Sequence, residues 1–492
     1  MSNQILSTRR TFLGAAAAAP FALQAASGPQ PFGAVPSPGQ WLWHQMEVYS
    51  FLHFTTNTFT DKEWGYGDED PSIFNPTAFD AGAMVSALKA GGRKGVILTC
   101  KHHDGFCLWP TKTTEHSVKR SKWRDGKGDV VKEISQAAAK QGLKFGVYLS
   151  PWDRNNAQYG RPEYVDIYRA QLKELLTEYG PIYEVWHDGA NGGDGYYGGA
   201  REKRTIDKKT YYGWPKTWDL VRQLQPNAVI FSDVGPDIRW VGNERGIAND
   251  TCWATYDPAG DKGGEASPGD VNARQSGTGT RNGKKWLPAE CDVSIRPGWF
   301  WHANQNEKVK TPAQLMDLYF KSVGRGASFL LNVPPDRRGL LHENDVASLK
   351  SFGSQLAALF EKNLAAGAKV KASSTLAGSY KAAHLLDGKR ETAWVAAEGA
   401  KTAEVEFTLK GEAGFNVIRL REEIRLGQRI GAFAVDAWKD GAWTAVGEGA
   451  SVGSCRLVKL AQPVKTGKVR VRITDSAAAP ALSEFGLYQA SA

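Results

Sequence analysis

The 492-residue sequence has few cysteines and no extended charge blocks. Its five cysteines are an odd number without a Cys-x-x-Cys pair, so neither a disulfide framework nor a thiolate metal cluster is expected, and at least one thiol should be free. Long basic runs are absent although the formal net charge is +9, which argues against a nucleic-acid partner. No cofactor is indicated, and a neutral substrate fits this charge as well as an acidic one.

The N-terminal apolar stretch, Ala15 to Ala26, falls short of the ~20 apolar residues that a membrane span needs. It follows Thr8-Arg9-Arg10-Thr11-Phe12-Leu13 and is rich in alanine. This arrangement is typical of a twin-arginine export signal over residues 1–26, with a short membrane anchor as the alternative. Removing the signal removes Arg9 and Arg10 and lowers the charge to +7. We expect a periplasmic or secreted bacterial protein that is free of the membrane once the signal is gone.

Residues 30–365 alternate short apolar runs with segments of helical periodicity. Seven strands are expected at 49–54, 95–100, 144–150, 183–187, 228–232, 290–295 and 328–333, with a weaker eighth at 251–255. Helices are expected at 81–90, 130–141, 163–179, 216–224, 312–323 and 343–364. Strands that alternate with helices predict a parallel sheet, and eight of them predict a (β/α)8-like TIM barrel. An open doubly wound sheet is the alternative, but no Gly-rich phosphate loop follows the first strand.

Residues 369–492 have a different pattern of apolar and polar residues, and residues 365–368 resemble a linker. Alternating apolar and polar residues at 403–409, 415–421, 432–438 and 468–474 are separated by turn residues. Short strands at this spacing predict an all-β sandwich. The pattern Leu385-Leu386-Asp387-Gly388 with Trp394 resembles discoidin-like carbohydrate-binding modules. Sugar binding and a purely structural role are both open for this domain.

Chemistry-bearing residues follow the expected barrel strands. Asp188, between Trp186 and Gly189, comes directly after an apolar run, which is the position of a catalytic residue in a β/α barrel; an Asx turn is the ordinary alternative. Similar strand-end positions are held by His53, Glu63, Trp64, His102, His103, Tyr148 and Trp299. Aromatic walls with a few converging donors and acids describe a sugar pocket, in which Trp186 and Trp299 are expected to contact substrate.

Five of these segments together resemble one enzyme family. They are Phe51-Leu52-His53-Phe54, Glu63-Trp64-Gly65, Cys100-Lys101-His102-His103-Asp104-Gly105-Phe106, Gly146-Val147-Tyr148-Leu149-Ser150-Pro151-Trp152 and Val185-Trp186-His187-Asp188-Gly189-Ala190. In this order they resemble the α-L-fucosidases of glycoside hydrolase family 29.

The resemblance implies a role for each matching residue. The nucleophile falls on Asp188, the fucose-binding histidines fall on His53, His102 and His103, and Glu63 and Tyr148 complete the site. His187 departs from the pattern, because an apolar or aromatic residue is more usual there. The implied substrate is a fucosylated oligosaccharide or glycoconjugate, hydrolysed with retention of configuration.

The acid/base residue has two candidates. The loop Gly235-Pro236-Asp237-Ile238-Arg239-Trp240-Val241-Gly242-Asn243-Glu244 resembles the subgroup specific for α-1,3/1,4-linked fucose, which places the acid/base on Glu244. Glu290, directly before Cys291, is the second candidate. A retaining glycosidase needs its two carboxyl groups about 5–5.5 Å apart.

Two other function classes compete with this interpretation. His53, His102, His103 and Asp188 are also residue types that bind metals, so a metal-dependent barrel hydrolase is a rival, although no His-x-His pair follows the first strand. A non-catalytic glycan-binding protein is the other. The presence of both Asp188 and Glu244 argues against the non-catalytic alternative, and the abundance of tryptophan suits a sugar better than a metal site.

Overall fold

Eight short strands close into a barrel in which every neighbouring pair runs parallel. The structure is a computed structural model and describes residues 28–490. Around the barrel the order is β1, β12, β11, β8, β7, β4, β3 and β2. Their bounds are Val48–Leu52, Ser328–Asn332, Ala289–Ser294, Ile238–Trp240, Val229–Ser232, Ile182–Trp186, Lys144–Leu149 and Gly95–Lys101. The predicted fold class, a barrel followed by an all-β domain, is confirmed.

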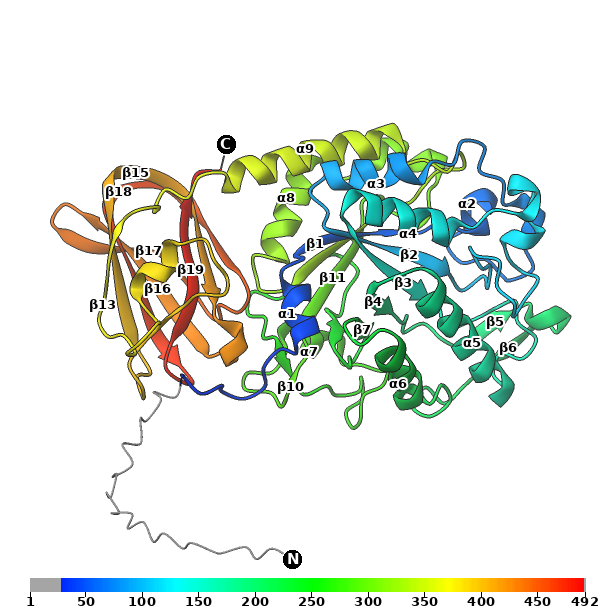
Figure 1. The fold of residues 1–492 in the computed structure, drawn as a ribbon, viewed down its shortest axis with the longest axis horizontal. Helices are drawn as coiled ribbons and strands as arrows, with labels where there is room; N and C mark the ends of the chain where they lie inside the picture. Colours follow the sequence, from blue (N-terminus) through cyan, green and yellow to red (C-terminus); the bar gives the residue numbers. More distant parts are fainter. Residues whose placement is uncertain (1–27, 491–492) are drawn as a thin grey trace, which may run out of the picture.

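Helices surround the barrel on its outside (Figure 1). The main ones are α3 (Ala81–Ala90), α4 (Val130–Gln141), α5 (Pro162–Glu178), α6 (Trp214–Leu224), α8 (Pro312–Lys321) and α9 (Glu343–Phe360), with shorter α1 (Pro38–His44), α2 (Thr56–Thr60) and α7 (Ala273–Thr278). Local sequence sets their ends. In α4, the Asp129 side chain accepts the N–H of Lys132, and Gly142 ends the helix at a φ of 76°. The helices cover strands such as β2, in which all seven residues are buried, and this explains the apolar runs.

The eighth barrel strand lies elsewhere than predicted. It is β8, Ile238–Trp240, and not 251–255; Thr255–Tyr256 (β9) instead pairs antiparallel with Lys285–Trp286 (β10) outside the barrel. A strand of three residues is too short to show the alternation of apolar and polar residues by which strands are recognised. Its central residue is also Arg239, fully buried, whose guanidinium donates to backbone carbonyls including that of Ser276. A charged residue in so short a segment hides the strand from a search for apolar runs.

The second domain is a sandwich of antiparallel strands. Its strand order is β14, β19, β15, β18, β16, β17, with β13 against β15. The bounds are β13 Lys369–Ala372, β14 Trp394–Val395, β15 Ala403–Glu422, β16 Ile430–Lys439, β17 Ala442–Gly449, β18 Arg456–Ser476 and β19 Ala481–Tyr488. The predicted strands 403–409 and 415–421 are two halves of the single strand β15, which is interrupted by register shifts against β18. Its core includes Trp394, Phe407 and Phe485.

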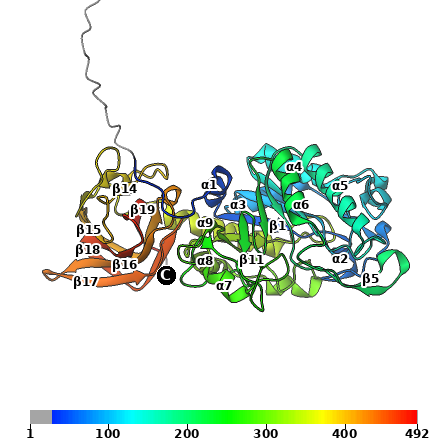
Figure 2. The same ribbon diagram turned by 90° about the horizontal axis from the view of Figure 1, so that it is seen from below.

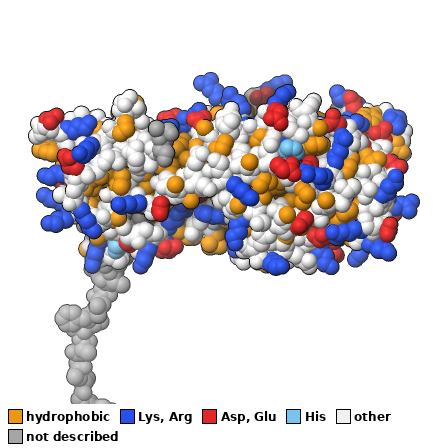
Figure 3. Space-filling view, turned by 90° about the horizontal axis from the view of Figure 1, so that it is seen from above, with side chains coloured by type: hydrophobic (Ala, Val, Ile, Leu, Met, Phe, Trp, Pro, Cys, Tyr) orange, Lys and Arg blue, Asp and Glu red, His pale blue; other side chains and the backbone are white. Residues whose placement is uncertain are grey.

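The two domains lie side by side (Figure 2). Glu47, just before β1, pairs with Arg390 and Arg421 of the sandwich. Lys and Arg side chains are scattered over both domains on the face drawn in Figure 3 and are interspersed with acidic ones. Among residues 28–490, no helix combines the length and apolar character needed to cross a bilayer. The proposed export signal lies outside the described residues.

Candidate active site

A pocket at the carboxyl ends of the barrel strands gathers nearly all the residues predicted to handle a sugar. It is lined by Phe51, His53, Trp64, His102, His103, Tyr148, Trp186, Asp188, Ala190, Glu244, Asp292 and Trp299. Its volume is about 80 Å³. Since one water needs about 10–15 Å³ by such a measure, the space takes several waters, which is the scale of a single sugar ring.

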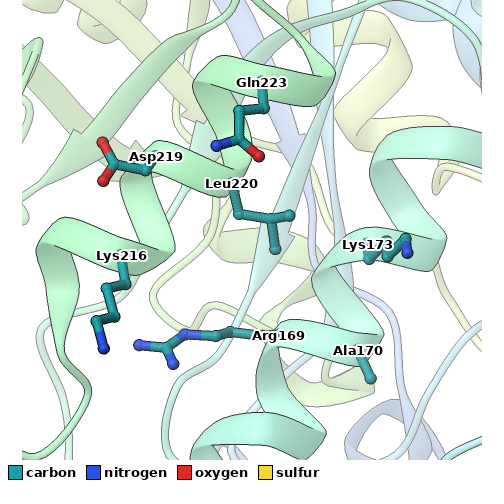
Figure 4. A pocket seen from close by; sticks show the side chains of 7 residues that line it. All are labelled: Arg169, Ala170, Lys173, Lys216, Asp219, Leu220 and Gln223. Carbon is teal, nitrogen blue, oxygen red and sulfur yellow. The ribbon is translucent and has the colours of Figure 1, made fainter.

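A larger hollow of about 460 Å³ lies between α5 and α6 on the outer helical layer (Figure 4). It is lined by Arg169, Ala170, Lys173, Lys216, Asp219, Leu220 and Gln223. Asp219 is the one carboxylic acid among these, and Arg169 is already bound to Thr217 and to backbone carbonyls. Acid/base hydrolysis requires two carboxyl groups around one reaction centre. The barrel pocket is therefore the candidate active site.

Asp188 follows β4 and is held by both of its carboxyl oxygens. Tyr148 Oη donates to Oδ2 at 2.9 Å, and the Ala190 backbone N–H donates to Oδ1 at 2.7 Å. The side chain is 22% exposed and faces the pocket. Burial raises the pKa of Asp188, while these two donors oppose the rise because they favour the charged form. The carboxylate is fixed in orientation, as a nucleophile must be.

Three histidines, His53, His102 and His103, line the pocket. His53 Nδ1 lies 2.9 Å from Asn332 Oδ1, and His103 Nδ1 lies 2.7 Å from Ser150 Oγ. Burial lowers the pKa of His53 and of His103 to about 3, and it lowers the pKa of His102 well below its usual value. With the Nδ1 atoms of His53 and His103 engaged in this way, the Nε2 atoms of these two histidines are left for a ligand. Uncharged imidazoles suit a neutral, hydroxyl-rich substrate.

Glu244 enters the pocket from the loop after β8. Trp299 Nε1 donates to Glu244 Oε2 at 3.1 Å. Burial raises the pKa of Glu244, the Trp299 hydrogen bond opposes this, and the charges of Asp188 and Glu63 raise it further. A raised pKa favours the protonated form, which a general acid requires.

Trp186 forms the floor of the pocket and Trp64 its rim. The Trp186 ring stacks on Phe231 at 4.1 Å between centroids and on Tyr148 at 5.1 Å. Trp64 is 51% exposed and meets the His103 ring edge-on at 5.1 Å. An exposed indole beside a polar pocket is a surface on which a sugar can stack.

Glu63 lies beside the pocket and not among the residues that line it, and its substrate-binding role stays a prediction. Its carboxylate accepts the Trp299 backbone N–H at 2.7 Å and lies 2.5 Å from His302 Nε2. Burial lowers the pKa of His302, but the hydrogen bonds that its ring donates to the carboxylates of Asp61 and Glu63 raise it overall. Glu63 thus holds the loop that carries Trp299.

Two protein-family models match most of the chain. Residues 31–359 match the family model described as "Alpha-L-fucosidase", and residues 369–485 match the F5/8 type C domain. The chain belongs to the alpha-L-fucosidase family. The family match and the similar proteins show that the chain is a glycoside hydrolase of family 29 with alpha-L-fucosidase activity, as predicted.

Similar proteins come from plants and bacteria. Alpha-L-fucosidase 1 of Arabidopsis thaliana is 43% identical over 94% of this chain and 88% of its own length. A putative alpha-L-fucosidase from Bacteroides thetaiotaomicron is 38% identical, with a TM-score of 0.84 over 94% of this chain and 99% of that one. A Ruminococcus gnavus GH29 fucosidase in complex with fucose is 33% identical, with a TM-score of 0.82 over 95% and 97%.

Glu290, the second acid/base candidate, lies inside the barrel and not in the pocket. It is fully buried near the start of β11. Its carboxyl group bonds Tyr49, accepts from Trp186 Nε1 at 2.6 Å and neighbours Glu184. An acid without access to the pocket cannot protonate a leaving group, so the geometry favours Glu244.

His187 lies on the opposite side of its strand from Trp186 and Asp188, because side chains alternate. Its Nδ1 is 2.7 Å from Tyr168 Oη, and its ring packs on Trp214 of α6. The departure from the family pattern therefore falls outside the pocket.

Asp292 is the pocket carboxyl group that the sequence analysis missed. The signal was present in β11, where Glu290, Asp292 and Ser294 alternate with apolar residues on one face. In a barrel strand that face points inward.

The metal-dependent alternative gains no support from residues 28–490, where no group of three or more His, Cys, Asp or Glu side chains has the arrangement to hold a metal ion. All five cysteines are buried and free, as the odd count suggested for at least one.

Proposed function

We propose that this fucosidase releases terminal α-L-fucose with retention of configuration, with Asp188 as nucleophile and Glu244 as acid/base. The observation that supports this most is that the two carboxyl groups line one pocket in contrasting environments. Asp188 accepts two hydrogen bonds, which favour its ionised form. Glu244 accepts one, and the negative charges of Asp188 and Glu63 raise its pKa. Environments of this kind separate the roles of two carboxyl groups.

In the first step, Asp188 attacks the anomeric carbon while Glu244 gives its proton to the departing glycosidic oxygen. A β-linked fucosyl-enzyme results. Glu244, now ionised, takes a proton from water, which attacks the same carbon and frees Asp188. A pocket of one-ring size agrees with exo action on a terminal residue.

The test is Glu244→Ala. Substrates with poor leaving groups should slow far more than activated aryl fucosides, whose oxygen scarcely needs a proton. Azide should restore turnover and yield α-fucosyl azide, since a second inversion restores the substrate configuration. Asp188→Asn should lose about 10⁴-fold or more in kcat, and Asp219→Asn, on the outer groove of Figure 4, is the matched control. Azide rescue in Glu290→Ala but not in Glu244→Ala would refute the assignment.

A preference for α-1,3/1,4-linked fucose on branched glycans is part of the proposal. The loop Gly235–Glu244 supports it by its resemblance to that subgroup. Weak hydrolysis of a simple aryl α-L-fucoside beside strong hydrolysis of a branched fucosylated trisaccharide is the expected result. The reverse order would exclude the preference.

Export through the twin-arginine route to the periplasm is also proposed, on the strength of Arg9-Arg10 and the alanine-rich stretch that follows. Replacing both arginines by lysine keeps the charge but removes the pair that is recognised. Cell fractionation should then find the enzyme in the cytoplasm. Undiminished periplasmic enzyme would contradict this route.

A further inference from the structure

The inward face of β11 carries polar residues at three successive levels. Glu290, Asp292 and Ser294 alternate along the strand and therefore point to the same side. Glu290 is enclosed in the barrel, and Ser294 Oγ accepts from Asn332 Nδ2 at 2.9 Å. Of these three, Asp292 alone lines the pocket.

One oxygen of Asp292 is fixed and the other has no protein partner. Trp240 Nε1 donates to Oδ1 at 2.9 Å. Within residues 28–490, no protein group is hydrogen-bonded to Oδ2. Asp292 is 3% exposed and lines the pocket, so the little access that its carboxyl group has is on the pocket side. Buried polar atoms normally have a partner, and a ligand is the group that can supply one here.

We propose that Asp292 is a further substrate-binding residue, which bonds a sugar hydroxyl beside Glu244 through Oδ2. This inference rests on the proposed function and adds one substrate contact to the pocket, near Glu244. Trp240 acts as the positioning residue, because its indole N–H fixes the carboxyl plane.

In its neutral form, Asp292 is a hydrogen-bond donor. Burial, together with the charges of Glu244 and Glu290, raises the pKa of Asp292 well above its usual value. Because Oδ1 accepts from the indole, the proton belongs on Oδ2, where it points to the ligand. A neutral donor also leaves Asp188 as the carboxylate that meets the anomeric carbon.

Two substitutions of similar size separate this role from a structural one. Asp292→Asn keeps an oxygen for Trp240 and presents an amide donor in place of the acid hydroxyl. Asp292→Leu offers neither. We expect the inhibition constant for free L-fucose to rise about 10- to 100-fold in Asp292→Leu, because a buried hydrogen bond is lost, and to change only about threefold in Asp292→Asn. KM for an aryl fucoside should follow the same order.

Trp240→Phe removes the indole donor and retains a ring, so it should give a smaller rise than Asp292→Leu. Melting temperatures establish that each variant is folded, and Asp292→Ala replaces Asp292→Leu if that variant does not fold. An unchanged inhibition constant in the folded apolar variant would overturn the proposal, as would an Asn variant as impaired as the apolar one. Wild-type enzyme that neither hydrolyses the fucoside nor binds L-fucose would instead overturn the proposed function itself.

Discussion

The side chain of Trp299 has one polar atom, the indole nitrogen, and it is hydrogen-bonded to the proposed acid, Glu244. Its indole N–H stabilises the ionised form of Glu244 and so works against the burial that raises the pKa of this residue. Trp299→Phe keeps an aromatic ring but removes the donor. The pKa of Glu244 should then rise further. Since the general acid is active while protonated, activity falls as pH increases through this pKa, and the alkaline limb of kcat/KM should move to higher pH.

The measurement is a kcat/KM profile of an aryl fucoside across the pH range in which the enzyme is folded. Trp64→Phe is the matched control, because Trp64 also lines the pocket but is not hydrogen-bonded to Glu244. Its alkaline limb should stay in place even if its rate falls. A limb that moves to lower pH in Trp299→Phe would contradict the argument.

At the same scale, the sequence predicts most of the residues that line the pocket, but not how deep inside the barrel each residue lies. Asp188, His53 and His102 directly follow apolar strands, and a strand end has one place in a barrel. Glu290 and Asp292 lie within a strand, where two residues separate the closed core from the pocket. That difference depends on strand tilt and on neighbouring side chains, which no linear pattern contains.

At the scale of elements, two loops are joined by one carboxylate. Glu63, after α2, accepts the Trp299 N–H and bonds His302 from the loop after β11. Glu63→Ala should free Trp299 and raise KM about tenfold, with a smaller effect on kcat, because the aromatic wall loses its anchor. Glu63→Gln keeps an amide oxygen for the backbone N–H and should be milder.

Steady-state kinetics and hydrogen exchange over residues 296–302 test this prediction. Exchange should quicken in Glu63→Ala, and Glu361→Ala, an exposed glutamate at the end of α9, should behave as wild type. A loss confined to kcat, with unchanged exchange, would mean that Glu63 acts in the chemistry and not on the loop.

Element prediction succeeded where packing produces a strong pattern. The helices α3 and α4 have the bounds expected from their periodicity and caps. The barrel strand β8 was missed because Arg239, in the middle of three residues, satisfies its guanidinium with backbone carbonyls from a distant segment. Tertiary contacts of this kind compensate a local pattern that argues against burial.

On the scale of the whole molecule, Glu47 joins the barrel to the sandwich. Its carboxylate lies between Arg390 and Arg421, 2.8 Å from the Nη1 atom of Arg421, and its side chain is 13% exposed. Burial raises the pKa of Glu47, but the two guanidinium groups outweigh burial and lower it overall. The folded-state pKa is thus below the unfolded value of 4.5. The contribution to stability is complete above that value and is lost as pH falls towards the folded-state pKa.

Glu47→Ala should therefore lower the free energy of unfolding by about 2 kcal/mol at pH 7, because Arg390 loses its carboxylate partner and the buried Arg421 is left with Glu484 as its carboxylate partner. The loss should shrink as pH falls below 4.5, where the unfolded chain binds the proton before the folded one. Glu412→Ala removes an exposed partner of Lys465 and should cost less than about 1 kcal/mol. Calorimetric unfolding of the full chain at pH 7 and pH 4 distinguishes the two variants. If Glu47→Ala is as mild as Glu412→Ala, or if its effect grows in acid, the pair with Arg390 and Arg421 does not join the domains energetically. Other contacts between the domains, such as the ion pairs of Arg456 with Asp250 and of Arg281 with Asp475, must then do so.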